Sequence, residues 1–229
     1  MAKQQKRLTK KEMKEDKVAD FFLAVANYAQ QNSRRITGVM VVIAIVAMIF
    51  TLAMRQRRAA ELEAQTMLAR ATLDLKQGNF SSALQGYAGI MDRFRGTRGY
   101  SDALFFSADA NFSTGRFDSA MVFFEKYLSQ KKRRPVFTVS AELGVAQCLE
   151  ELGRFTDAAA GYLKVQREHA EEPLAPDALF GAARCYDLAG DLKQAETIYK
   201  ELIDRYPKSR QANLAKMPLL EIQAKLENT

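Results

Sequence analysis

A ten-residue pattern that begins with glycine occurs four times in this chain, and it restricts the possible folds more than any other feature. The four copies are GNFSSALQGY, GRFDSAMVFF, GRFTDAAAGY and GDLKQAETIY, which start at Gly78, Gly115, Gly153 and Gly190. Successive glycines are 37, 38 and 37 residues apart. A constant period of this size is typical of repeat proteins, in which one supersecondary unit is stacked several times. The sequence therefore predicts an array of four repeats.

Other residue types recur at fixed distances from each glycine. Alanine stands five residues after it, at Ala83, Ala120, Ala158 and Ala195, and an aromatic residue stands nine after it, at Tyr87, Phe124, Tyr162 and Tyr199. Helical patterns lie on both sides of every glycine, so we expect the glycine to end one helix in a left-handed backbone conformation. The alanines then let two helices cross closely while the aromatics fill the remaining space. Each repeat is predicted to be an antiparallel helix pair, which makes the fold all-α and the architecture a helical-hairpin solenoid.

These columns and turns resemble the tetratricopeptide repeat over residues 64 to 209. Three features differ: the chain has no Trp, the first small position is Ala, and the period is longer than the family's usual length of about 34 residues. We expect loops between the repeats to hold the extra residues. Residues 211–226 are predicted to form a capping helix that covers the last pair. Its buried face is expected to contain Leu214, Met217, Leu220 and Ile222.

A long apolar segment precedes the repeats. Residues Ile36 to Met54 are 19 residues without a charge, and as a helix they would span roughly 28 Å, close to the hydrocarbon thickness of a bilayer. The alternative is a buried core helix, although core helices are rarely uncharged on every face. The predicted organisation is a basic tail with an amphipathic helix over 1–35, a transmembrane helix over 36–54, a juxtamembrane helical linker over 55–63, and the repeat solenoid with its capping helix over 64–229.

The excess positive charge lies on both sides of the apolar segment. Residues 1–35 contain nine Lys or Arg and four acidic residues, which favours a cytoplasmic N-terminus. Arg55, Arg57 and Arg58 favour the opposite orientation, but long domains are translocated largely regardless of charge. Residues 59–229 have 22 basic and 23 acidic residues, so the repeats are not suited to the phosphate backbone of a nucleic acid. We predict a single-pass protein of the bacterial inner membrane with periplasmic repeats.

The sequence contains no recognisable catalytic or cofactor motif. The single histidine, His169, has no sequence neighbours at metal-binding or catalytic spacing, so we expect a solvent-exposed side chain. Cys148 and Cys185 occupy equivalent positions in successive repeats and are predicted to be separate buried thiols. The basic run from Lys131 to Arg134 is predicted to be a solvated loop, with anionic lipid or an acidic partner as the alternative. We expect no enzymatic activity, no cofactor, no metal and no small-molecule substrate.

The first helix of each pair is expected to line a concave face that binds extended or helical peptides. The side chains expected to point into it are Phe105, Asp109, Phe112, Gln147, Phe180 and Arg184. An equally acceptable interpretation of Phe105 and Phe180 is that they belong to the core. Because this set mixes aromatic and charged groups, it suits a peptide better than a small metabolite.

The order of charged tail, single span and helical repeats resembles the YfgM-type ancillary subunits of the bacterial Sec translocon, as do the segments KEDKVADFF and TRGYSDALFFSADA. The resemblance implies partners among translocon subunits, periplasmic chaperones and emerging secreted proteins. One alternative is an envelope-assembly or division factor of the Tol–Pal or outer-membrane-assembly type, because ELIDRYPKS resembles the repeat ends of those proteins. A second is a cytoplasm-facing receptor for chaperones or precursors, which requires the opposite topology.

Overall fold

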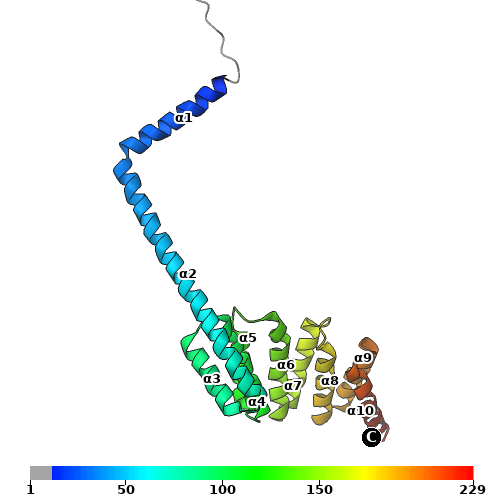
Figure 1. The fold of residues 1–229 in the computed structure, drawn as a ribbon. Coiled ribbons are helices and arrows are strands. Elements are labelled where there is room, and N and C mark those ends of the chain that lie inside the picture. The colour runs from blue at the N-terminus through cyan, green and yellow to red at the C-terminus, as the bar shows by residue number, and fades with distance from the viewer. Residues whose placement is uncertain (1–11, 229) are drawn as a thin grey trace, which may run out of the picture. The chain divides into compact units, whose positions relative to one another are not determined.

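The structure is a computed structural model that describes residues 12–228, and the side chains from residue 20 onward except those of residues 22 and 29. The part of the basic tail before residue 12 therefore lies outside the described residues. The described chain is helical without strands, which confirms the all-α prediction (Figure 1). Ten helices follow one another in the described chain: α1 Glu12–Gln31, α2 Ser33–Lys76, α3 Phe80–Arg93, α4 Arg98–Ser113, α5 Phe117–Leu128, α6 Pro135–Glu151, α7 Phe155–Glu168, α8 Ala175–Leu188, α9 Leu192–Arg205 and α10 Arg210–Glu227.

The chain divides into two units, residues 1–56 and 57–229. The first contains α1 and the beginning of α2. One window of α2 has a mean hydropathy of 2.7 and none of it is buried, so this helix is long and apolar enough to cross a membrane. Helix α2 continues without a break through residues 55–63 and ends at Lys76. Its last four turns contribute Ala64, Leu68 and Ala71 to the core of the second unit.

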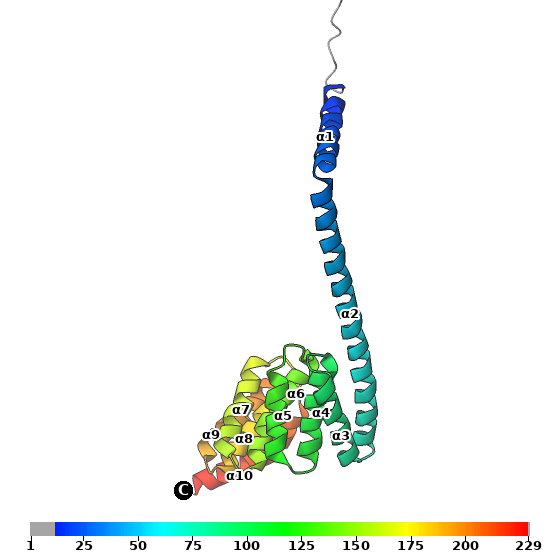
Figure 2. The same ribbon diagram turned by 90° about the vertical axis from the view of Figure 1, so that its left-hand side faces the viewer.

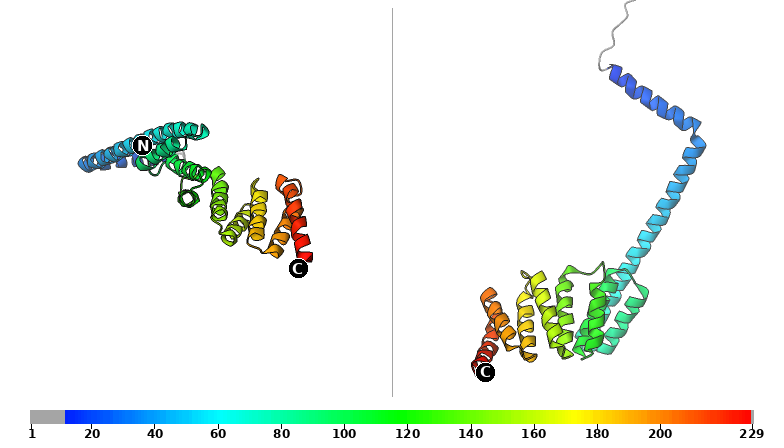
Figure 3. Two further views of the ribbon diagram at one scale, coloured as in Figure 1. Left: turned by 90° about the horizontal axis from the view of Figure 1, so that it is seen from below. Right: turned by 180° about the vertical axis from the view of Figure 1, so that it is seen from behind.

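The second unit is a row of helical hairpins, which Figure 2 and Figure 3 show side by side from α4 to α10. The pairs are the end of α2 with α3, α4 with α5, α6 with α7, and α8 with α9, and α10 packs on α9 and α8. Each pair also contacts the next one, through α3 and α4, α5 and α6, and α7 and α8. The first helices of neighbouring pairs meet as well, since α4 contacts α6 and α6 contacts α8. This arrangement is the helical-hairpin solenoid that the sequence predicts.

The four repeat glycines reverse the chain between the two helices of each pair. Gly78, Gly115, Gly153 and Gly190 have φ values of 77°, 73°, 74° and 81°. Only glycine adopts this left-handed conformation without a steric cost from Cβ, so the residue at this column is set by the backbone. The backbone N–H of the residue that follows each glycine then donates to a carbonyl near the end of the preceding helix, as in the bond from Arg154 N to Leu149 O at 2.9 Å. The glycines therefore have a structural role.

The alanine and aromatic columns form the core of each hairpin. Ala83, Ala120, Ala158 and Ala195 are 0% exposed. The aromatic column is no more than 5% exposed, and it comprises Tyr87, Phe124, Tyr162 and Tyr199. The small residues allow close approach of the backbones, and the rings fill the space that remains. The core therefore runs along the whole unit as three clusters of buried side chains.

The capping helix exists, but its predicted buried face was wrong. Leu214, Met217 and Leu220 are 50%, 64% and 60% exposed, and of the four predicted residues only Ile222 is buried. The buried residues are instead Ala212, Ala215 and Ile222. These residues are three and then seven positions apart, which places them on one face of the helix. The sequence favoured the larger apolar side chains, whereas the buried face has small residues at Ala212 and Ala215, where the helices approach closely, and a large one only at Ile222.

Candidate protein-binding groove

A groove of about 490 Å³ lies along the first helices of the first three hairpins. Helix α2 forms one wall, and the opposite side comes from α4 and from the beginning of α6. The lining side chains are Gln65, Leu68, Ala69, Thr72, Leu73, Lys76, Asp102, Phe106, Arg134 and Phe137. This size is within the range of ligand sites in proteins. We call this site the α2–α4–α6 groove.

The carboxyl group of Asp102 is the most unusual feature of this groove. The residue is 0% exposed, and neither carboxylate oxygen accepts a hydrogen bond from any described residue. Arg134 Nη2 lies 2.8 Å from Oδ2 as an ion-pair contact, but the approach lacks hydrogen-bond geometry. Burial raises the pKa of Asp102, and the charge and close N–H contact of Arg134 oppose this effect only in part. A buried acceptor without a donor is costly, so this carboxyl group is suited to a donor supplied by a ligand.

Aromatic rings lie beside this carboxyl group. Phe106 and Phe137 line the groove, with ring centroids 5.7 Å apart in an edge-on arrangement. Phe105 lies behind them, stacked on Phe137 at 4.6 Å and edge-on to Tyr127 at 5.5 Å. Such contacts fix the rings, because offset-stacked and edge-on pairs are the favoured geometries. The groove therefore offers a rigid apolar surface next to an unsatisfied acceptor.

The basic run is an exposed loop that also supplies one residue of the groove, Arg134. Residues 129–134 connect α5 to α6, and Arg134 turns inward to Asp102. The backbone carbonyl of Arg134 accepts a hydrogen bond of 2.7 Å from the hydroxyl of Tyr127. Lys132 Nζ donates to the carbonyl of Gly96 at 2.5 Å. Residues 131–134 are all exposed, in agreement with the predicted solvated connection, and Arg134 and Lys132 also hold the loop against α4 and the turn before it.

The six residues predicted for the concave face are not brought together in this groove. Phe105 is half-buried behind it, and Asp109, one helical turn beyond Phe106, is exposed. Phe112 packs edge-on against Phe117 at 5.3 Å, and Gln147 is exposed on α6. Arg184 and Phe180 lie together on α8, with the guanidinium carbon 5.7 Å from the ring centroid.

Arg184 is also part of a polar network between α6 and α8. Its Nε and Nη2 donate to Glu150 at 2.6 and 2.8 Å, and the hydroxyl of Tyr162 donates to the same carboxylate at 2.8 Å. Burial acts to raise the pKa of Glu150, but the hydrogen bonds from Arg184 and Tyr162 outweigh it and lower the pKa. Phe180 packs edge-on against Tyr199 at 5.9 Å. These contacts join neighbouring repeats.

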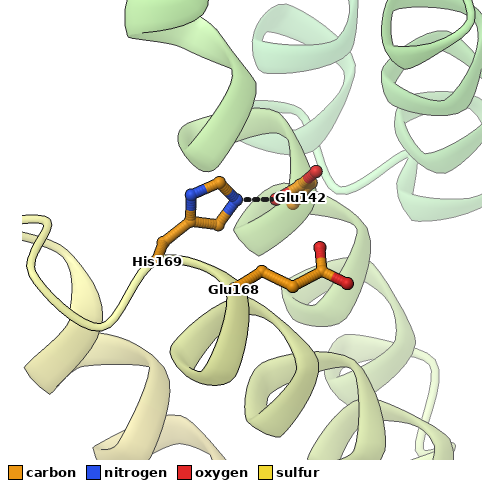
Figure 4. A group of neighbouring side chains, drawn as sticks. All are labelled: Glu142, Glu168 and His169. Carbon is orange, nitrogen blue, oxygen red and sulfur yellow. Dashed lines mark hydrogen bonds and ion pairs between the residues drawn. The ribbon is translucent and has the colours of Figure 1, made fainter.

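His169 has partners that its sequence neighbourhood does not contain. Its Nε2 lies 2.8 Å from Glu142 Oε2, and its side chain is only 24% exposed (Figure 4). The expectation of a solvent-exposed histidine was therefore wrong, because this side chain is partly buried and paired with Glu142. Glu142 is on α6, 27 positions away in sequence, and only the packing of two helices brings it to the histidine. Glu168, at the end of α7, completes a cluster of three.

The two cysteines are buried free thiols, as predicted. Cys148 lies on α6 and Cys185 on α8, and both are 0% exposed. Burial raises the pKa of each thiol to about 12. A thiol that stays protonated is a poor nucleophile and a poor metal ligand, so these residues act as small core side chains.

Sequence reasoning missed the principal groove residues because it followed a neighbouring helix face. Asp102 and Phe106 are four residues apart, which places them on one face of α4. The predicted Phe105 and Phe112 follow a line one residue away, about 100° around the helix. A buried acid in the middle of an apolar run, SDALFF, was the available signal.

Comparison with protein-family models identifies tetratricopeptide repeats at residues 68–135 and 177–209. Comparison with curated protein sequences gives no match. Solved structures of similar fold include a tetratricopeptide repeat protein from Parabacteroides merdae, with a TM-score of 0.60, 16% identity and coverage of 72% of this chain and 61% of that one. The apo form of RapI gives a TM-score of 0.64, 17% identity and coverage of 73% and 50%.

A third similar structure is YrrB, described as a tetratricopeptide repeat protein with an unusual peptide-binding site. Its TM-score is 0.55 at 14% identity, over 67% of this chain and 74% of that one. This chain thus spans 61% and 50% of the first two structures. At such identities the likeness concerns the fold. The family models identify tetratricopeptide repeats over residues 68–135 and 177–209, and the solved structures show that the row of hairpins has a tetratricopeptide-like fold.

Proposed function

We propose that this protein is a membrane-anchored scaffold whose α2–α4–α6 groove binds a segment of a partner protein. The observation that carries the proposal is the buried Asp102 carboxyl group, which lines the groove and whose one polar contact among the described residues is the ion pair with Arg134. Tetratricopeptide repeats generally serve protein–protein interaction, so the groove fits the role of the fold. The peptide-binding site described for YrrB is a precedent for this use of the fold.

The chemistry of the groove favours a peptide over a small metabolite. An N–H group of a peptide would satisfy Asp102, while an apolar side chain would cover the rings of Phe106 and Phe137. Lys76 and Arg134 line the same groove and would bind carbonyl or carboxylate oxygens of the segment. An extended peptide presents alternating N–H and C=O groups together with side chains, and the groove offers polar groups for the former and an apolar surface for the latter.

The apolar part of α2 serves as the anchor in this proposal. Its large side chains, such as Val42, Ile43 and Phe50, are 60%, 55% and 64% exposed. A continuous apolar surface of this extent needs cover, and a bilayer provides it along the whole segment Ile36–Met54. Following the charge of the tail, the N-terminus is cytoplasmic and the repeats are periplasmic.

At the finer level we propose a role at the Sec translocon, in which the repeats contact translocon subunits or periplasmic chaperones and assist emerging proteins. Its support is the likeness of the chain layout to the ancillary translocon subunits. An envelope-assembly or division factor and a cytoplasm-facing precursor receptor are the alternatives. All three share the scaffold function and differ in topology and partner.

Site-specific photo-crosslinking tests the groove directly. A crosslinker at Leu73, which lines the groove and is 55% exposed, should capture discrete partner proteins in cells. A matched crosslinker at Val122 on α5, 43% exposed and outside the groove, serves as the control. Replacing Phe137 by Ala should reduce capture from Leu73 by on the order of tenfold, because it removes a buried aromatic contact. If the crosslinkers at Leu73 and Val122 capture proteins equally and Phe137→Ala changes neither, the groove is not the binding site.

Two readouts separate the finer alternatives. A compartment-sensitive reporter fused after Thr229 should be active only outside the cytoplasm. A reporter that is active in the cytoplasm would exclude periplasmic repeats and favour the precursor receptor. Identification of the proteins captured from Leu73 then decides the partner: translocon subunits support the Sec assignment, whereas Tol–Pal or outer-membrane-assembly proteins replace it.

A further inference from the structure

Three side chains with metal-binding atoms meet at the boundary between α6 and the end of α7. Glu142 comes from α6, Glu168 is the last residue of α7, and His169 is the C-cap of α7. One ligand atom of each lies within 4.8 Å of those of the other two. Figure 4 shows the imidazole facing the carboxylate of Glu142, with the carboxylate of Glu168 on the adjacent turn. The set contains one nitrogen and two oxygen donors.

The backbone holds this cluster in place. The N–H of His169 donates to the carbonyl of Val165 at 2.9 Å, and the carbonyl of His169 accepts from the N–H of Glu172 at 3.0 Å. Helix packing fixes Glu142, because α6 and α7 form one hairpin. Glu168 is exposed and therefore free to rotate toward the other two. Two of the three ligands are thus positioned in advance, and the third closes the site with a side-chain rotation.

The electrostatics of the cluster favour a cation. The C-terminal end of a helix carries partial negative charge, and Glu168 adds a full negative charge at that point in α7. Glu142 adds another, and Glu168 has no ion-pair partner among residues 12–228. The described side chains leave this accumulation of negative charge uncompensated at Glu168. A divalent cation would compensate both carboxylates and the helix end together.

We propose that Glu142, Glu168 and His169 form a binding site for a first-row divalent cation of the zinc class. Imidazole and carboxylate together suit Zn²⁺, Co²⁺ or Ni²⁺, whereas Mg²⁺ and Ca²⁺ prefer oxygen ligands alone. Tetrahedral bonds of about 2.0–2.1 Å place ligand atoms roughly 3.3 Å apart, so the present spacing needs only a small closure. Water or a partner side chain would take the fourth position.

The bound cation would fix the segment between α7 and α8 to the preceding hairpin. Residues 169–174 make the connection from the third pair to the fourth, and His169 is its first residue. The proposal does not depend on the protein-binding groove, which is formed by α2, α4 and the beginning of α6. The chain contains a single histidine, so replacing it removes every imidazole from the protein. Cys148 and Cys185 are buried and do not compete in the folded chain.

The test titrates the full, tag-free chain in detergent with Zn²⁺ and with Co²⁺. We expect one equivalent of Zn²⁺ to bind and to raise the thermal unfolding midpoint, and Co²⁺ to produce the intense visible absorption of a tetrahedral nitrogen–oxygen site. Mg²⁺ at the same concentration should do neither. Absence of Zn²⁺ binding at one equivalent would overturn the proposal.

Three variants separate a metal site from a simple His–Glu ion pair. His169→Ala and Glu142→Gln should each weaken Zn²⁺ binding by on the order of tenfold or more. Glu168→Gln is decisive because this exposed residue has no role in the ion pair, so it should weaken Zn²⁺ binding while leaving metal-free stability unchanged. Glu171→Gln, an exposed acid in the same connection, is the matched control and should bind as the parent does. Unchanged binding in Glu168→Gln, or equal loss in Glu171→Gln, would contradict the assignment.

Discussion

Two carboxylates in the second unit occupy comparable positions and have opposite properties. Asp102 on α4 and Glu150 on α6 are 1% and 12% exposed at the side chain, and each faces an arginine that is 45% exposed. Glu150 accepts two hydrogen bonds from Arg184 and one from Tyr162. Asp102 has an ion-pair contact at 2.8 Å and no hydrogen bond from a described residue. The pKa of Glu150 is lowered, whereas burial raises that of Asp102.

The difference separates a structural ion pair from a group suited to binding. Glu150 joins the first helices of two repeats, and its acceptors are satisfied inside the fold. Asp102 is more deeply buried and lines a groove, and in our proposal a partner supplies the additional donor. Buried ion pairs stabilise only when their geometry is good and the remaining polar atoms are bonded. We therefore expect Glu150 to contribute to stability and Asp102 to contribute to binding.

Removal of each carboxylate should give the largest contrast. Glu150→Ala should lower the free energy of unfolding by about 2–3 kcal/mol, because it leaves the buried hydroxyl of Tyr162 and the guanidinium of Arg184 without an acceptor. Asp102→Ala should change it by less than about 1 kcal/mol, since burial already disfavours that charge. Chemical denaturation measures both values.

Glu151→Ala is the control for this contrast, because Glu151 is the exposed neighbour of Glu150 and should be nearly neutral. Partner capture by the crosslinker at Leu73 should respond in the opposite way to stability: it should be lost in Asp102→Ala and retained in Glu150→Ala. Equal destabilisation by the two replacements would remove the distinction between the sites.

The pH dependence of stability should differ in sign between the two groups. The folded pKa of Glu150 is below its unfolded value, so its stabilisation is complete above about pH 4.5 and disappears as the pH falls. The folded pKa of Asp102 is above its unfolded value, so its ionisation costs stability as the pH rises through that folded pKa.

Measurements of the free energy of unfolding between about pH 3 and 7 should show these opposite signs. Glu150→Gln should be less stable than the parent at neutral pH, and this difference should shrink as the pH falls. In Asp102→Asn, stability relative to the parent should improve toward neutral pH. Parallel curves for both variants would contradict the opposite shifts.

The smallest effect concerns the two thiols, which report local opening. Cys148 and Cys185 have pKa values raised to about 12, so alkylation at pH 8 should be very slow in the folded chain and fast in denaturant. Cys185 lies close enough to Glu150 for that carboxylate to raise its pKa. Glu150→Ala should accelerate labelling of Cys185 by roughly tenfold, whereas Asp102→Ala should not. Mass spectrometry of each labelled cysteine measures this, and equal acceleration by both variants would show that the two regions open together.

The sequence predicted the fold more successfully than the site. The glycine period and the alanine and aromatic columns are local patterns that indicated hairpins, and each repeat glycine has the expected left-handed backbone. The groove was harder to predict, because moving one residue along α4 leads from Asp102 and Phe106 to a different face. The same difficulty affected α10, where Ala212 and Ala215 are buried in place of Leu214 and Met217.

The set of elements follows from the sequence: one long apolar helix, four glycine-linked hairpins and a terminal helix. Helical periodicity and the backbone conformation that favours glycine are properties of short segments, so they can be recognised without knowing the neighbouring helices. Which polar groups meet depends on the packing of the helices, as with Glu142 and His169 or Arg134 and Asp102. These pairs are far apart along the chain, and their contact depends on how adjacent hairpins are packed. For the same reason Asp102 and Glu150, both acids on first helices, differ in their hydrogen-bond partners.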